Sequence, residues 1–83
     1  MTDLMRKIDA LAKSHHAKRV KVVRVKLGAL SHFTPEHFQE HFDHASAGSI
    51  AEGAKLDMEM STDMSAPFAQ DVLLDAIEVE ERG

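Results

Sequence analysis

The chain of 83 residues contains no cysteine, tryptophan or tyrosine, and only two prolines and four glycines. The absence of cysteine excludes disulfides and thiolate metal sites. No apolar run approaches the roughly 20 residues that span a membrane, and the first residues lack the apolar block of a secretory signal. We therefore expect one small domain in the cytoplasm, without a membrane partner.

Large apolar side chains are scarce, because the aromatic residues other than histidine are four Phe. The core must therefore be built from Val, Leu, Ile, Met and Ala around Phe38 and Phe42. A domain of this size buries a modest share of its surface. Association with a partner or with a second copy, as a homo-oligomer, would enlarge such a core.

The net charge of −4 is unevenly distributed. Residues 1–32 hold eight Lys/Arg and two Asp, whereas residues 33–83 hold two Lys/Arg and twelve Asp/Glu. A basic segment can bind nucleic acid. The residues available for such binding are Arg6, Lys7, Lys13, Lys18, Arg19, Lys21 and Arg24. The alternation described below favours mutual neutralisation inside one sheet, so we expect no nucleic acid partner.

Two segments have the periodicity of amphipathic helices. The first covers about residues 3–16, with Thr2 as its cap. Its apolar stripe consists of Leu4, Met5, Ile8, Leu11 and Ala12. The second covers about residues 35–47 and starts with Thr34-Pro35-Glu36, in which a capping residue precedes a proline suited to the first helical position. Its apolar stripe consists of Phe38, Phe42 and Ala45.

Three segments alternate as strands do: Val20 to Leu27, Ala54 to Met60 and Val72 to Glu80. In the first, Val20 and Val22 are out of phase with Val23, Val25 and Leu27, which predicts a bulged or covered strand start. The second places Leu56, Met58 and Met60 on one face. In the third, strict alternation groups Leu73 with Ile77 and Val79.

The order of these elements, α-β-α-β-β, predicts an α+β fold in which two helices pack on one face of a three-stranded sheet. The other face would carry Arg24 and Lys26 among the acidic side chains of the neighbouring strands. Residues 61–71 contain Pro67 and have no period, so they are expected to form a short loop. We expect residues 1–83 to form a single domain.

Several motifs are similar to those of a known family. They are Arg-Val-Lys-Leu-Gly-Ala-Leu-Ser at residues 24–31, Pro35-Glu36 with Phe38 and Phe42, and Gly-Ser-Ile-Ala-Glu-Gly-Ala-Lys-Leu at residues 48–56. With these motifs the chain resembles the HypA/HybF family of hydrogenase and urease nickel-incorporation accessory proteins. The resemblance implies a domain of three strands and two helices. It also implies delivery of nickel to a metalloenzyme precursor, together with a maturation GTPase.

The chain departs from the family at both of its metal sites. The family has a zinc domain with two Cys-x-x-Cys pairs between its last two strands, where this chain has residues 61–71 and no cysteine, so zinc is not expected in the family's manner. The family's nickel site at Met-His-Glu falls on Met1, Thr2 and Asp3. Thr2 replaces the imidazole that nickel favours. The resemblance therefore implies a degenerate nickel site that retains Asp3 and the N-terminal amine.

The sequence contains six histidines, three of which share one face of the second predicted helix. His37, His41 and His44 follow at i, i+4 and i+7, and a pair one turn apart can chelate Ni²⁺, Zn²⁺ or Cu²⁺. The whole stripe covers about 10 Å of helix, too far for all three to hold one ion readily. Alternatively, these side chains lie at the core boundary beside the Phe stripe.

The sequence contains no nucleophile–base constellation and no glycine-rich phosphate loop, so we do not expect an enzyme. The first hypothesis is a HypA-like docking and metallochaperone module that recognises a metalloenzyme precursor or a GTPase. The alternatives are a metal carrier or sensor that uses His37, His41 and His44, or a purely protein–protein interaction module. Met58, Met60 and Met64 are expected in the core rather than in a thioether metal site.

Overall fold

The computed structural model describes residues 2–31, 33–65, 67 and 69–81. Its elements are α1 (Thr2–Ser14), β1 (Ala17–Leu27), α2 (Pro35–Ser46), β2 (Lys55–Met60) and β3 (Val72–Glu81). The predicted α+β class and the order α-β-α-β-β are confirmed. The helix bounds differ slightly from those expected, since α1 already includes Thr2 and ends two residues early.

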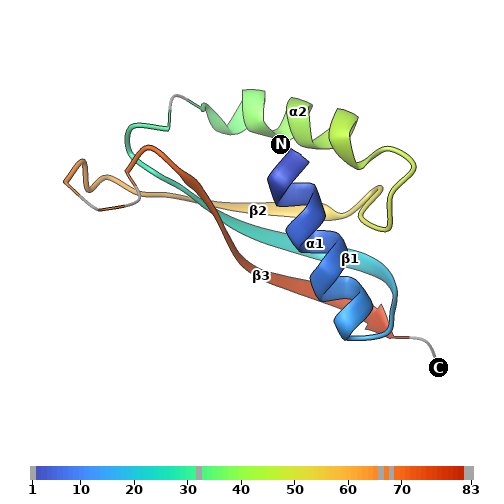
Figure 1. Ribbon diagram of the computed structural model, residues 1–83. Helices are drawn as coiled ribbons and strands as arrows, with labels where there is room; N and C mark the ends of the chain where they lie inside the picture. Colours follow the sequence, from blue (N-terminus) through green and yellow to red (C-terminus); the bar gives the residue numbers. More distant parts are fainter. Residues whose placement is uncertain (1, 32, 66, 68, 82–83) are drawn as a thin grey trace.

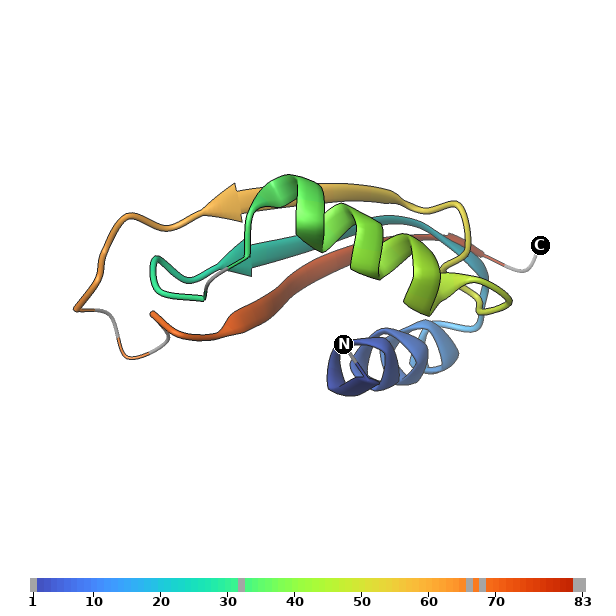
Figure 2. The ribbon, with the colours of Figure 1, turned by 90° about the horizontal axis from the view of Figure 1, so that it is seen from above.

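The three strands form one sheet in the order β2-β1-β3, with β1 parallel to β2 and antiparallel to β3. A parallel pair needs a crossover connection, and α2 provides it between β1 and β2. Figures 1 and 2 show α2 crossing over the sheet, with α1 next to α2. Both helices contribute to the core on the same side of β1, as Ile8, Phe38 and Phe42 cluster with Val23 and Val25.

The central strand β1 buries Ala17, Val20, Val23, Val25 and Leu27, so the buried positions are first three and then two residues apart. Two register shifts against β3 fall within the first part of the strand, between Ala17 and Arg19 and between Val20 and Val22. At each shift β1 has one more residue than β3, so the side chains of β1 that follow point to the opposite face of the sheet from the one that strict alternation predicts. The predicted bulge at the strand start is therefore confirmed, and Val20 is only 2% exposed.

A third register shift overturns the expected face of Leu73. Arg24 pairs with Ala76 and Val25 pairs with Leu74, which leaves Asp75 as an extra residue in β3. Strict alternation predicted that Leu73 shares a face with Ile77. Because of the bulge, Leu74 packs against the core with Ile77 while Leu73 remains 36% exposed.

The core lies between the helices and the sheet, and Phe38, Phe42, Ile8 and Leu27 are among its largest fully buried side chains. Other predicted core positions proved wrong. Leu11 is 39% exposed and lines an open depression with Leu73 and Leu74, and Ala45 is exposed whereas Ser46 is buried. Met60 and Met64 are also exposed, at the end of an edge strand and beyond it.

The connection between β2 and β3 begins and ends beside the end of β1, because Met60 and Val72 both pair with Leu27. The backbone N–H of Ser61 donates to the carbonyl of Leu27, and the N–H of Gly28 donates to the carbonyl of Asp71, each at 2.9 Å. The described residues between the two strands form no helix or strand.

Among the described residues, no helix combines the length and the apolar character that crossing a bilayer requires.

Candidate functional site

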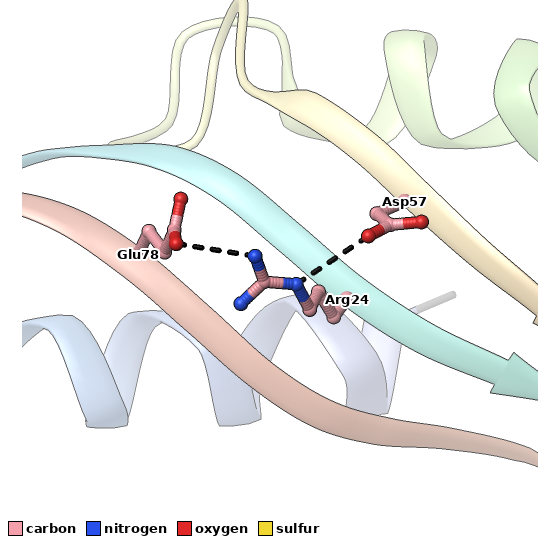
Figure 3. Close-up of polar contacts among 3 residues, drawn as sticks. All are labelled: Arg24, Asp57 and Glu78. Carbon is pink, nitrogen blue, oxygen red and sulfur yellow. Dashed lines mark hydrogen bonds and ion pairs between the residues drawn. The ribbon is translucent and has the colours of Figure 1, made fainter.

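The open face of the sheet carries a cross-strand charge network, drawn in Figure 3. Arg24 of β1 donates to the Glu78 carboxylate of β3 at 3.1 Å and to the Asp57 carboxylate of β2 at 3.4 Å. The hydrogen bond that Arg24 donates to Glu78, followed by the negative charge of Glu78 and then by the contributions of Asp57, raises the pKa of Arg24 above its ordinary value. Arg24 therefore stays charged and links all three strands through one side chain.

Further ion pairs occupy basic side chains of residues 1–32. Arg19 pairs with Glu80 across the sheet, and on α1 Lys13 pairs with Asp9 at 2.9 Å. In the sheet, Arg19 and Arg24 of the basic segment therefore pair with acidic side chains of the neighbouring strands, as the alternation predicts.

Of Met1, Thr2 and Asp3, the residues on which the resemblance implies a nickel site, the last two fall at the start of α1. Met1 is outside the described residues, and Thr2 is the first residue of the helix. The Asp3 side chain is 89% exposed and lies 3.8 Å from the guanidinium of Arg6. Asp3 also borders a cavity of about 150 Å³ whose other lining residues are Leu4, Phe33, Phe38 and Val72. The start of α1 therefore lies next to the start of α2.

The start of α2 is fixed by the signals that the sequence predicted. Thr34 has an extended backbone, and its Oγ1 accepts a hydrogen bond from the N–H of His37 at 3.2 Å. Pro35 occupies the first turn, where its missing N–H leaves no helical bond unmade. The rings of Phe33 and Phe38 meet edge to face with centroids 5.4 Å apart. This contact is a hydrophobic staple across the cap.

The solvent side of α2 carries four potential ligands, which we call the α2 histidine face. They are His37, Glu40, His41 and His44, and together they line a surface depression of about 300 Å³. All four residues are exposed. The ring of His41 lies edge-on to that of Phe33, with centroids 6.0 Å apart.

The structure brings the predicted histidines together along one helix but does not assemble them into a finished metal centre. Within the described residues, no three His, Asp or Glu side chains already converge as metal ligands would. The spacing of His37, His41 and His44 in the sequence predicts that they share this face. The sequence does not predict the contact of Phe33 with His41, although an apolar residue directly before the Thr34 cap is a sequence signal for a staple.

Comparison with known proteins gives a consistent match over most of the chain. Residues 1–65 match the family described as "Hydrogenase/urease nickel incorporation, metallochaperone, hypA". The hydrogenase maturation factor HypA of Methylocella silvestris is 39% identical over 61 residues, which are 69% of this chain and 54% of that protein. The corresponding protein of Archaeoglobus fulgidus is 42% identical over 57 residues, 69% of this chain and 52% of that protein.

The chain spans about half the length of these curated relatives. The matched residues include α1, β1, α2 and β2, which are the elements that carry the motifs noted in the sequence. The chain therefore belongs to the HypA family of hydrogenase and urease nickel-incorporation metallochaperones.

Proposed function

We propose that this protein acts in the maturation of a nickel metalloenzyme of the hydrogenase type, as a docking and metallochaperone module with a weakened nickel site. The observation that carries the proposal is the family match over residues 1–65. Thr2 stands at the position where the resemblance implies a nickel-binding histidine, and this is why we propose a weakened site. Its partner would be a metalloenzyme precursor or a maturation GTPase.

Nickel is the cargo in this proposal, and the start of α1 is where it would be held. The first four N–H groups of a helix have no intrahelical partner, so using this backbone for a ligand breaks no helical hydrogen bond. The exposed Asp3 supplies a carboxylate beside it. Thr2 offers only a hydroxyl in place of an imidazole, which favours weak and readily reversed binding.

Calorimetric titration of Ni²⁺ into the chain with a free N-terminus tests the weakened site. Thr2→His should tighten binding about tenfold or more, equivalent to about 1.4 kcal/mol, because it restores the imidazole. Asp3→Ala should weaken binding at the same position, and His15→Ala, an exposed histidine away from α1's start, serves as the control. Unchanged affinity in Thr2→His would contradict the assignment of the nickel position.

The docking role is tested in cells that lack their own HypA but keep the rest of the maturation system. Expression of this chain should restore hydrogenase activity, and Thr2→His should restore it further at low external nickel. If neither the wild-type chain nor Thr2→His restored any hydrogenase activity, the proposed function would be overturned. Restoration by a chain that binds no nickel would instead favour the purely protein–protein interaction module.

A further inference from the structure

The two sides of α2 have separate roles in the structure. Its buried residues are Phe38, Phe42 and Ser46, which face the sheet. At about 100° per residue, the four members of the α2 histidine face fall within an arc of about 100° on the opposite side. All four residues are exposed, and His41 alone among them has a described ring contact, with Phe33 at the edge of the core.

We propose that the α2 histidine face is a second metal site, for a borderline divalent ion such as Ni²⁺ or Zn²⁺. His37 and His41 are its primary ligands, and Glu40 is the third. The site goes beyond the proposed function, because none of its ligands belongs to the family's nickel position at the start of α1.

The backbone of α2 sets the geometry of this pair. Residues at i and i+4 are neighbours on a helix, with Cβ atoms about 5–6 Å apart, so the imidazoles of His37 and His41 can reach one ion. Glu40 is three residues from His37 and lies on the same side. His44 is about 10 Å further along the helix than His37, so it belongs to the rim of the site.

The ligands are not yet converged in the structure, and binding requires their side chains to rotate. Exposed side chains change rotamer within picoseconds to nanoseconds, so this rearrangement is fast. The edge-on contact with Phe33 restricts the ring of His41. A partly restricted ring loses less freedom on binding, so His41 is the anchor of the site.

The donor set selects the class of ion. Imidazole nitrogens suit Zn²⁺, Ni²⁺ and Cu²⁺, whereas Mg²⁺ and Ca²⁺ prefer oxygen ligands. Two imidazoles and one carboxylate leave further coordination positions to water. The site is thus open, and an ion bound there can be passed to another protein.

Titration with Zn²⁺ and, separately, with Ni²⁺ at neutral pH tests the site, followed by calorimetry and by the histidine signals in nuclear magnetic resonance. His37→Ala and His41→Ala should each lower the affinity about tenfold or more. Glu40→Gln and His44→Ala should have smaller effects, and His15→Ala none. Because a ligand that binds only the folded chain raises its melting temperature, Zn²⁺ should stabilise the wild type but not the His37→Ala/His41→Ala double variant.

Affinity unchanged in the double variant would overturn the proposal, as would the same shift of histidine signals with Mg²⁺ as with Zn²⁺. The Thr2→His and Asp3→Ala titrations are repeated in the double variant, so that binding at the start of α1 is measured alone. Failure at one position is then distinguishable from failure at the other.

Discussion

The two sides of α2 differ in what they contribute to the protein. On one side, Phe38 and Phe42 are each only 1% exposed and join the helix to the core. The opposite side holds exposed polar groups on the same backbone. The core side supplies stability, and the rigid placement that it gives the helix positions the outer side chains. The exposed side chains of α2 can therefore be substituted with little change in the free energy of unfolding.

The largest loss of stability is expected from a substitution on the buried side of α2. Phe42→Ala should lower the free energy of unfolding by about 3–5 kcal/mol, because it removes a fully buried ring between helix and sheet. His44→Ala on the outer side of the same helix is the matched control and should change it by less than about 0.5 kcal/mol. Urea denaturation followed by circular dichroism measures both. Equal effects would contradict the division between the two sides.

A second pair of variants tests the same division on β3. Leu74→Ala should destabilise by about 1–3 kcal/mol, since this side chain packs partly into the core. Leu73→Ala, one residue earlier and more exposed, should cost less than about 0.5 kcal/mol. The reverse order, measured in the same urea experiment, would mean that the bulge at Asp75 does not exist.

The helix start is expected to contribute less. Thr34→Ala removes the oxygen that accepts from the N–H of His37, at a cost of about 1 kcal/mol. Thr34→Ser keeps the hydroxyl and should be close to neutral. The melting temperatures of the two variants separate the cap from general effects of substitution at this position. A Ser variant as unstable as the Ala variant would argue against the cap.

The smallest effect concerns the open face of the sheet. Arg24→Gln should reduce stability only slightly, because the ion pairs with Glu78 and Asp57 are exposed. Because the pKa of Arg24 is raised in the folded chain, this contribution is fully present from neutral pH up to the ordinary pKa of arginine, and on the alkaline side it is lost only as the pH rises through the folded value. The difference between wild type and variant should therefore be the same at neutral and at mildly alkaline pH, and smaller in high salt.

Local signals made the helices and their order predictable. Thr34-Pro35-Glu36 marked the start of α2, and the cap hydrogen bond forms within the same turn. The phase of Phe38 and Phe42 also indicates which side of α2 is buried. It could have shown that His37, His41 and His44 point outward, since these positions lie across the helix.

The faces of β3 could not be derived in this way. The extra residue Asp75 depends on how β3 pairs with β1, and nothing within residues 72–80 reports that partner. In β1 the sequence did indicate the bulge, because strict alternation would place Val20 on the face of the charged side chains, where an apolar valine is not expected. The bulge in β3 gave no such conflict, since leucines occur at both Leu73 and Leu74.

The connection from β2 to β3 starts and ends on either side of Leu27, two strand spacings apart, or about 10 Å. Both of its ends are hydrogen-bonded to the end of β1, through Ser61 to Leu27 and through Gly28 to Asp71. These bonds hold β2 and β3 beside β1 independently of the length of the connection. The entropic cost of lengthening such a loop grows only logarithmically. The connection between β2 and β3 is therefore a site where a whole additional domain can be inserted or removed while the three-stranded sheet keeps its structure.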